Sequence, residues 1–232
     1  MGELFRSGRA FQPLLDSRPD DLAWPEMPWP MDPGVELRGG IVTLTGVHDP
    51  DRDARELFAA LDDDTVWGHL SGRPADVDAL RARLRDALEP GPRFQWIVRL
   101  SVPYRGLPAG AVVGQTSYLD VAAPDARLEI GSTGYHPAVW ASAVNPETKL
   151  LLLGQAFDRL RAGRVQLKTD IRNERSQRAI DRLGARFEGV LRRHMRRADG
   201  TVRDTVMFSI LAEEWPEVRR GLNARVRSAS AG

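Results

Sequence analysis

The sequence predicts an α/β protein in which a mixed β-sheet carries helices on both faces. Two segments with helical spacing precede the first long strands, and the stretch from Arg127 to Leu211 then alternates strand, helix, strand, helix and hairpin. Helices that alternate with strands bury their apolar stripes against a sheet. We therefore expect a layered fold around one central sheet.

Each element follows from a local pattern. Apolar residues at steps of three and four indicate helices, and short apolar runs bounded by turn residues indicate strands. Two glycines between apolar runs, and an Asp-Gly pair, indicate hairpins. The expected elements, in order, are a hairpin of Val35–Leu37 and Ile41–Thr45, helices over Asp53–Leu61 and Pro74–Leu88, strands over Phe94–Leu100, Ala111–Asp120 and Arg127–Gly134, a helix from Asn145, a strand over Arg164–Asp170, a helix from Asn173 to Leu183, a hairpin of Phe187–Arg196 and Val202–Leu211, and a last short helix from Glu213.

The chain of 232 residues fits one domain with an extension, because domains run to about 100–200 residues. Residues 1–33 are rich in proline near Trp24 and Trp29, and proline lacks the amide hydrogen that a strand needs, so this extension is predicted to be extended coil. We favour packing of both tryptophans on the domain surface, since Trp stabilises mainly by burial. The alternative is that they cover a substrate channel or a neighbouring subunit. Residues 34–220 then form the domain and residues 221–232 a flexible tail.

Composition excludes several classes of protein. The formal net charge is +1, so no bulk field indicates a nucleic-acid or membrane partner. The absence of cysteine excludes disulfides, cysteine-ligated zinc and a cysteine nucleophile, and the four histidines show no ligand spacing, so we expect no metal site. No apolar run reaches the length of a signal peptide or a membrane span, so we expect a soluble cytoplasmic protein. Lys149 and Lys168 are the only lysines.

The loop that joins the strand Arg127–Gly134 to the helix from Asn145 is a candidate anion site. The free N–H groups of a first helical turn and the positive end of the helix dipole point into such a loop. The plainer interpretation is an ordinary turn that Asn145 caps. The candidate phosphate-binding residues are Trp140, Ala141, Ser142, Ala143, Val144 and Asn145.

A second motif follows downstream. Asn173-Glu174-Arg175-Ser176 opens the next helix, which ends at Leu183-Gly184, and Glu188-Gly189-Val190-Leu191-Arg192 follows on a strand. In this order and spacing the chain resembles the GNAT superfamily of acyl-CoA N-acyltransferases. The resemblance is greatest to the branch that contains the Rim-type ribosomal-protein N-terminal acetyltransferases, and it covers roughly Val35 to Trp215.

The resemblance implies a GNAT fold with acetyl-CoA as co-substrate. The coenzyme is expected in a splay between the strands Arg127–Gly134 and Arg164–Asp170, with its diphosphate on the amides of the loop. Alanine stands at Ala141 and Ala143 where glycine is usual in the family, and Ala141 is the departure, because alanine adopts positive φ less readily.

The resemblance also implies roles for the second motif. Asn173 is expected beside the pantetheine arm and Arg175 among the coenzyme contacts, although Asn173 also suits an N-cap, and both roles can hold together. Many family members protonate the leaving thiolate with a tyrosine, but no tyrosine lies in this helix. The Rim-like branch uses a serine hydroxyl instead, which indicates Ser176.

Glu129 is the candidate base. Amine acylation needs one, because an ammonium has no lone pair for attack. Glu129 alternates with Leu128 and Ile130, so its side chain faces opposite to theirs. A solvated carboxylate on a strand face is an equally weighted alternative.

The acceptor residues are expected in the loop between the first two helices, which borders the acceptor site in GNAT folds. Asp64, Trp67 and His69 lie there, and acidic residues attract a cationic amine. A polar turn that ends a helix explains the same residues.

Together these patterns predict an N-acetyltransferase that moves an acetyl group directly from acetyl-CoA to a primary amine, on a peptide N-terminus or a small molecule. A catalytically inactive coenzyme-binding scaffold is the alternative. Family members are often dimers, so a homodimer stays open.

Overall fold

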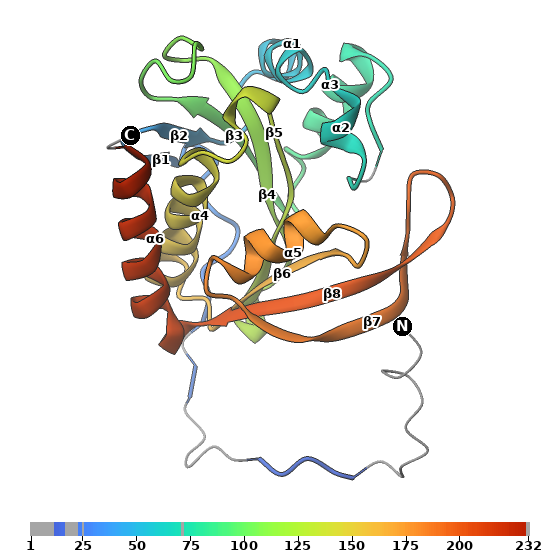
Figure 1. Ribbon diagram of the computed structural model, residues 1–232, viewed down its shortest axis with the longest axis vertical. Coiled ribbons are helices and arrows are strands. Elements are labelled where there is room, and N and C mark those ends of the chain that lie inside the picture. The colour runs from blue at the N-terminus through green and yellow to red at the C-terminus, as the bar shows by residue number, and fades with distance from the viewer. Residues whose placement is uncertain (1–11, 17–22, 25, 71, 231–232) are drawn as a thin grey trace.

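An eight-stranded mixed sheet organises the computed structural model, which describes residues 12–16, 23–24, 26–70 and 72–230 (Figure 1). The strand order is β1-β2-β3-β4-β5-β6-β8-β7, and only the β5–β6 pair is parallel. The mixed sheet predicted from the sequence is therefore confirmed. The strands are β1 (Glu36–Arg38), β2 (Val42–Thr45), β3 (Phe94–Leu100), β4 (Val112–Ala122), β5 (Arg127–Tyr135), β6 (Arg164–Asp170), β7 (Arg186–Arg196) and β8 (Val202–Leu211).

Helices cover both faces of the sheet, as expected. Trp96 and Val98 of β3 belong to one buried cluster, whereas Ile97 between them belongs to another, because successive side chains of a strand point to opposite faces. The last three helices contribute to the cluster of Trp96, and the first three to that of Ile97. The helices are α1 (Pro50–Ala60), α2 (Asp64–Trp67), α3 (Val77–Asp86), α4 (Val144–Gly154), α5 (Glu174–Asp181) and α6 (Trp215–Ser230).

Several helix boundaries differ from the sequence-based expectation, including the start of α1 at Pro50 rather than Asp53. The second predicted helix begins at Val77 rather than Pro74, because the Asp76 side chain accepts a hydrogen bond from the Ala79 amide and caps it. The short helix α2 was not predicted. Instead of a short helix and a flexible tail from residue 221, α6 continues to Ser230, and its Leu222 is buried against the core. Ala231 and Gly232 lie outside the described residues.

The described part of the N-terminal extension packs on the domain. Trp24 donates its indole N–H to the Arg161 carbonyl (3.1 Å), and Trp29 donates to the Gly91 carbonyl (3.0 Å). Met27 and Met31 are buried in the main core. The preferred packing of the tryptophans on the domain surface agrees with these contacts. Residues 1–11, 17–22 and Pro25 lie outside the described part of the chain.

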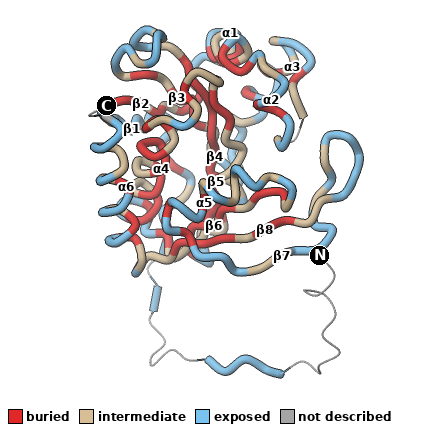
Figure 2. The backbone as a smooth tube through the Cα atoms, viewed as in Figure 1, coloured by how far each residue is buried: buried red, intermediate tan, exposed pale blue. Residues whose placement is uncertain are grey.

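The centre of the sheet opens between β5 and β6. Their parallel ladder joins only residues 127–129 to residues 164–166, although β5 continues to Tyr135 and β6 to Asp170. Within β5, Ser132 has φ +49°, and the register against β4 shifts at this point. Such a bulge bends its strand. The two strands therefore diverge in the buried middle of the molecule, whereas β7 forms the exposed outer edge (Figure 2).

Candidate active site

The N-cap residue of α4 provides no side-chain cap. The helix begins at Val144, not Asn145, and its N-cap residue is Ala143. The alternative that Asn145 caps the helix is wrong, because its side-chain oxygen accepts from the Tyr135 hydroxyl (3.2 Å). Ser142 Oγ accepts from the Val144 amide (3.2 Å).

Four main-chain amides at this loop are free. The N–H groups of Ala141, Ser142, Ala143 and Asn145 have no hydrogen-bond acceptor among the residues that the structure describes. Ala143 and Val144 are fully buried, so the loop offers its backbone rather than these side chains. Free amides at the start of an 11-residue helix bind anions well, because the helix dipole adds to their charge.

Ala141 adopts the conformation that usually requires glycine. Its φ is +51°, in the left-handed region, which costs an L-residue about 1–2 kcal/mol. Arg105, from the turn between β3 and β4, donates to the carbonyl oxygens of Trp140 (3.1 Å), Ala141 (3.4 Å) and Ala138 (3.5 Å). These contacts occupy the carbonyl groups of the loop and leave its amides free. The departure from glycine therefore preserves the backbone geometry of an anion-binding loop.

Two segments far apart in the sequence meet at a cleft of about 350 Å³. Trp140 comes from the loop, while Asn173 and Arg175 come from the start of α5. The Arg175 guanidinium lies 4.4 Å from the centre of the Trp140 ring, a cation–π contact. The structure thus brings together three of the residues predicted to bind a cofactor. Arginine side chains and free amides fit a diphosphate. The lining residues are Thr65, His69, Trp140, Arg172, Asn173, Glu174 and Arg175.

The N-cap interpretation of Asn173 is confirmed, because its side-chain oxygen accepts from the Ser176 amide (3.0 Å). The Ser176 hydroxyl is partly exposed and has no hydrogen-bond partner among the described residues. It is therefore available to a ligand.

Glu129 is buried, with 1% of its surface exposed, so the alternative of a solvated carboxylate is wrong. Its Oε2 lies 2.7 Å from Lys168 Nζ and accepts from Gln166 Nε2 (3.2 Å). Its Oε1 accepts no hydrogen bond from the described residues and lies over Gly131, where a Cβ atom would stand 2.7 Å from it. Glycine at 131 is therefore required for this placement, and Oε1 keeps its lone pairs free.

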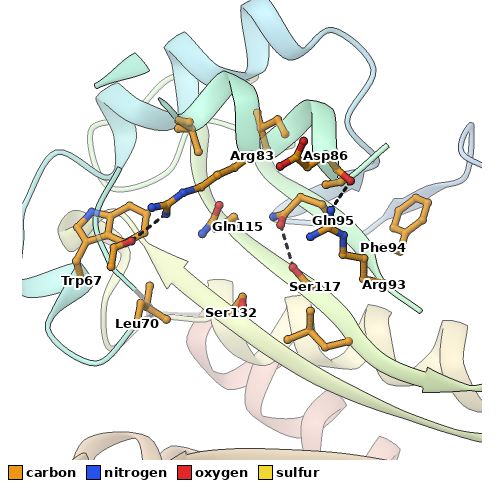
Figure 3. Close-up of a pocket in the computed structure, with 15 residues that line it drawn as sticks. Trp67, Leu70, Arg83, Asp86, Arg93, Phe94, Gln95, Gln115, Ser117 and Ser132 are labelled. Atoms are coloured by element: carbon orange, nitrogen blue, oxygen red, sulfur yellow. Dashed lines mark hydrogen bonds between the residues drawn. The ribbon is translucent and has the colours of Figure 1, made fainter. Parts of the chain in front are cut away.

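A second cavity, of about 220 Å³, lies between α2, α3 and the sheet (Figure 3). Trp67, one of the predicted acceptor residues, lines it. The other two lie elsewhere: His69 lines the cleft of Trp140, and Asp64 is exposed and paired with Arg73, which also pairs with Asp62. The three predicted acceptor residues therefore do not form one site. Arg73 also partly neutralises the negative charge of Asp62 and Asp64.

The comparisons with known proteins agree with this geometry. Residues 42–186 match the family model described as the acetyltransferase (GNAT) domain. The chain belongs to the GNAT acetyltransferase family. The GNAT fold and acyltransferase activity expected from the sequence are thus confirmed, and the family uses acetyl-CoA to acetylate an amine.

Solved GNAT structures cover nearly the whole chain. One from T. thermophilus, assigned as an acetyltransferase without a named substrate, is 38% identical, with a TM-score of 0.71 over 88% of this chain and 99% of that one. A GCN5-related N-acetyltransferase from Brucella melitensis is 26% identical, with a TM-score of 0.78 over 88% and 89%. Mycobacterium smegmatis RimJ in complex with CoA-disulfide shares the fold at 21% identity, with a TM-score of 0.66 over 82% and 92%. The curated proteins include no match.

Two absences hold for the described part of this GNAT protein. It contains no helix long and apolar enough to cross a bilayer. The same residues include no group of three or more His, Cys, Asp or Glu side chains that could hold a metal ion.

Sequence reasoning missed the roles of both lysines. Lys168 pairs with Glu129, and Lys149 lies buried beneath the β5 bulge, where its Nζ donates to Thr133 Oγ1 (3.0 Å). Burial lowers the pKa of Lys149 to about 7, because the charged form is poorly solvated there. All other fixed positive charges of the chain are arginines, so the rarity of lysine was the sequence signal that could have identified these two residues. Gln115 and Ser132, which line the cavity between α2, α3 and the sheet, and Arg105, which contacts the loop before α4, had no sequence signal, since only the folded sheet places them there.

Proposed function

We propose that this GNAT protein is an acetyl-CoA-dependent N-acetyltransferase of the Rim-like type, which acetylates a primary amine on a peptide N-terminus or a small molecule. The free amides of Ala141–Ala143, in the loop that follows the diverging end of β5, carry the proposal. Amides at the start of a helix hold a diphosphate. A chain that leads from this diphosphate into the opening between the strands presents its thioester beside β5. The binding of CoA-disulfide by RimJ, which shares the fold, supports this assignment.

The reaction begins with the acceptor nitrogen. The ammonium form must lose a proton before its lone pair can attack the thioester carbon. We assign this proton to Glu129, directly or through water, because Oε1 is uncommitted while Oε2 is held by Lys168. The C–N bond forms as the C–S bond breaks, the acylated nitrogen loses its second proton to give the amide, and the thiolate leaves and takes up a proton.

Two further groups complete the proposed mechanism. The β5 amides that face the opening have no strand partner beyond Glu129 and stabilise the negative charge on the thioester oxygen. The free hydroxyl of Ser176 donates a hydrogen bond to the departing sulfur. Transfer is direct, because the chain contains no cysteine to carry the acyl group.

Two measurements test this function. Calorimetry with CoA is expected to show binding, and thiol release from acetyl-CoA is expected with at least one amine of a panel of peptides, amino acids and polyamines. Arg38→Ala, an exposed change on β1, serves as the control and leaves both unchanged. A protein that binds no CoA would contradict the proposal, as would turnover that persists in a Glu129→Gln, Ser176→Ala double variant.

A further inference from the structure

Two polar side chains face the cavity between α3 and the sheet without a hydrogen-bond partner in the described part of the chain. Gln115 of β4 is 8% exposed, points into this cavity, and its carboxamide has no hydrogen-bond partner among the described residues (Figure 3). Ser132, on the β5 bulge, also lines the cavity with an unpartnered hydroxyl. Both side chains therefore keep hydrogen-bonding groups available to a ligand in the cavity.

Neighbouring polar groups in the same cavity are satisfied and provide an internal comparison. Ser117 donates its hydroxyl to Gln95 Oε1 (3.0 Å). The Gln95 amide nitrogen donates to the carbonyl groups of Trp96 and Thr116 (both 3.2 Å). Gln95 and Ser117 therefore need no ligand. Among the uncharged polar side chains described around the cavity, only Gln115 and Ser132 lack a hydrogen-bond partner.

The position of Ser132 joins this cavity to the proposed coenzyme site. Ser132 lies three residues beyond Glu129, where the β5–β6 ladder ends. Leu119, another lining residue, is directly opposite Glu129 in the β4–β5 ladder. A nitrogen bound near Ser132 therefore lies beside both the opening between the strands and the proposed base.

The rim of the cavity is positive. Arg83 and Arg93 stand against a single carboxylate, Asp86. Each arginine donates to a main-chain carbonyl, Arg83 to Gly72 (2.9 Å) and Arg93 to Asp86, and neither forms a salt bridge with a described residue. An excess of positive charge attracts an anionic group and repels a polycation.

Part of the cavity wall is apolar and contains no carboxylate, so this part fits an uncharged side chain. It is formed by Trp67, Leu70, Leu80, Leu84, Ala87, Phe94 and Leu119.

We infer that this cavity is the acceptor site and that it takes a small amine bearing a carboxylate and an apolar side chain, as in a free apolar amino acid. The amine lies at Gln115 and Ser132, the carboxylate at Arg83, and the side chain against Trp67 and Leu84. This inference rests on the proposed acetyl-transfer function. It selects one acceptor class from those that the family context leaves open.

Matched acceptor pairs test the inference. With saturating acetyl-CoA, kcat/KM is measured for L-leucine and L-phenylalanine, for their C-terminal amides, and for spermidine. Loss of one charge-assisted contact is worth about 1.4 kcal/mol or more, so we expect each free acid to exceed its amide by about tenfold or more. Higher turnover of the amides or of spermidine would overturn the amino-acid assignment and leave acetyl transfer intact.

Variants locate the contacts. Arg83→Met is expected to reduce the acid-to-amide ratio to near one, whereas Arg127→Met, on a half-buried arginine outside the cavity, leaves it unchanged. Gln115→Leu is expected to raise the acceptor KM about tenfold or more without changing the KM for acetyl-CoA or lowering Tm, because no internal bond is lost. Gln115→Met gives the same readout if the leucine variant packs poorly. Unchanged acceptor KM in a folded Gln115 variant would contradict the site.

A binding measurement distinguishes failure of the acceptor-site inference from failure of the proposed acetyl-transfer function. Calorimetry of L-leucine against protein saturated with CoA is expected to show binding that Arg83→Met weakens. If CoA binds and neither amino acid binds or reacts, the inference is wrong and the proposed function stands. If CoA does not bind, the proposed function fails first.

Discussion

The two sides of the site are built differently. On the coenzyme side, the proposed contacts are main-chain amides of one continuous stretch, Ala141–Ala143. On the acceptor side, the uncommitted groups are side chains from two strands, Gln115 and Ser132, with Arg83 from a helix at the rim. Main-chain donors exist for any residue except proline, so this side keeps its chemistry when alanine replaces glycine. The acceptor side depends on side-chain identity and can change with single substitutions.

The largest expected effect lies where the two sides meet. Glu129→Gln is expected to lower kcat about 100-fold or more, because general base catalysis contributes about 10²–10⁴. The KM for acetyl-CoA should change little, since Glu129 does not line the cleft of Trp140. Steady-state kinetics at several pH values measure both constants. A kcat within threefold of wild type in a folded variant would remove Glu129 from the mechanism.

A second change tests the main-chain side. Ala143 has φ −72°, which proline accepts, so Ala143→Pro removes one amide donor while keeping φ at this position. A hydrogen bond to a charged group contributes about 1.5–3 kcal/mol, so the Kd for CoA is expected to rise about 10–100-fold. Ser142→Ala is the control for disturbance of the loop, since it keeps the amide and removes a hydroxyl that donates to the Val139 carbonyl group and accepts from the Val144 amide. Equal losses in both variants, measured by calorimetry, would mean that disturbance of the loop, and not the missing amide, weakens CoA binding.

A third prediction concerns the buried Lys149, whose ammonium nitrogen donates to Thr133 of β5. The pKa of Lys149 is about 7 in the folded protein against 10.5 for an unperturbed lysine, owing to burial. Between these values the unfolded chain binds more protons. The free energy of unfolding should therefore rise with pH from about 7 to 10, by up to about 1.4 kcal/mol per pH unit. Urea denaturation across this range measures the slope. Lys149→Met should abolish that contribution, and a variant with the wild-type slope would show that Lys149 stays charged when folded.

The smallest expected effect concerns the loop conformation. Ala141→Gly removes the cost of a left-handed alanine and should stabilise the protein by about 1 kcal/mol, which corresponds to about 2–4 °C in Tm. Arg105→Met should weaken CoA binding in the wild-type background more than in the Ala141→Gly background if Arg105 helps to hold the strained turn. Calorimetry of the four proteins gives this coupling. Strict additivity would indicate that Arg105 acts independently of Ala141.

Local patterns predicted most of the fold. Apolar spacing identified both early helices and the strands, and Asn173 identified the start of α5 to within one residue. The errors occurred at helix ends. The capping bond of Asp76 moved the start of α3, and packing of Leu222 extended α6 beyond the expected tail. A helix end depends on which side chain caps it and what its last turns bury, and neither follows from apolar spacing.

The sequence by itself determined the family, the order of elements and the loop whose amides precede α4, because these depend on residues close together in the chain. Only the tertiary structure decided that Glu129 pairs with Lys168 and that Arg105 donates to the carbonyl group of the left-handed Ala141. It also decided that Asp64 pairs with Arg73. Those contacts join residues from separate elements. Their partners are set by strand order and helix placement, which local propensity does not specify.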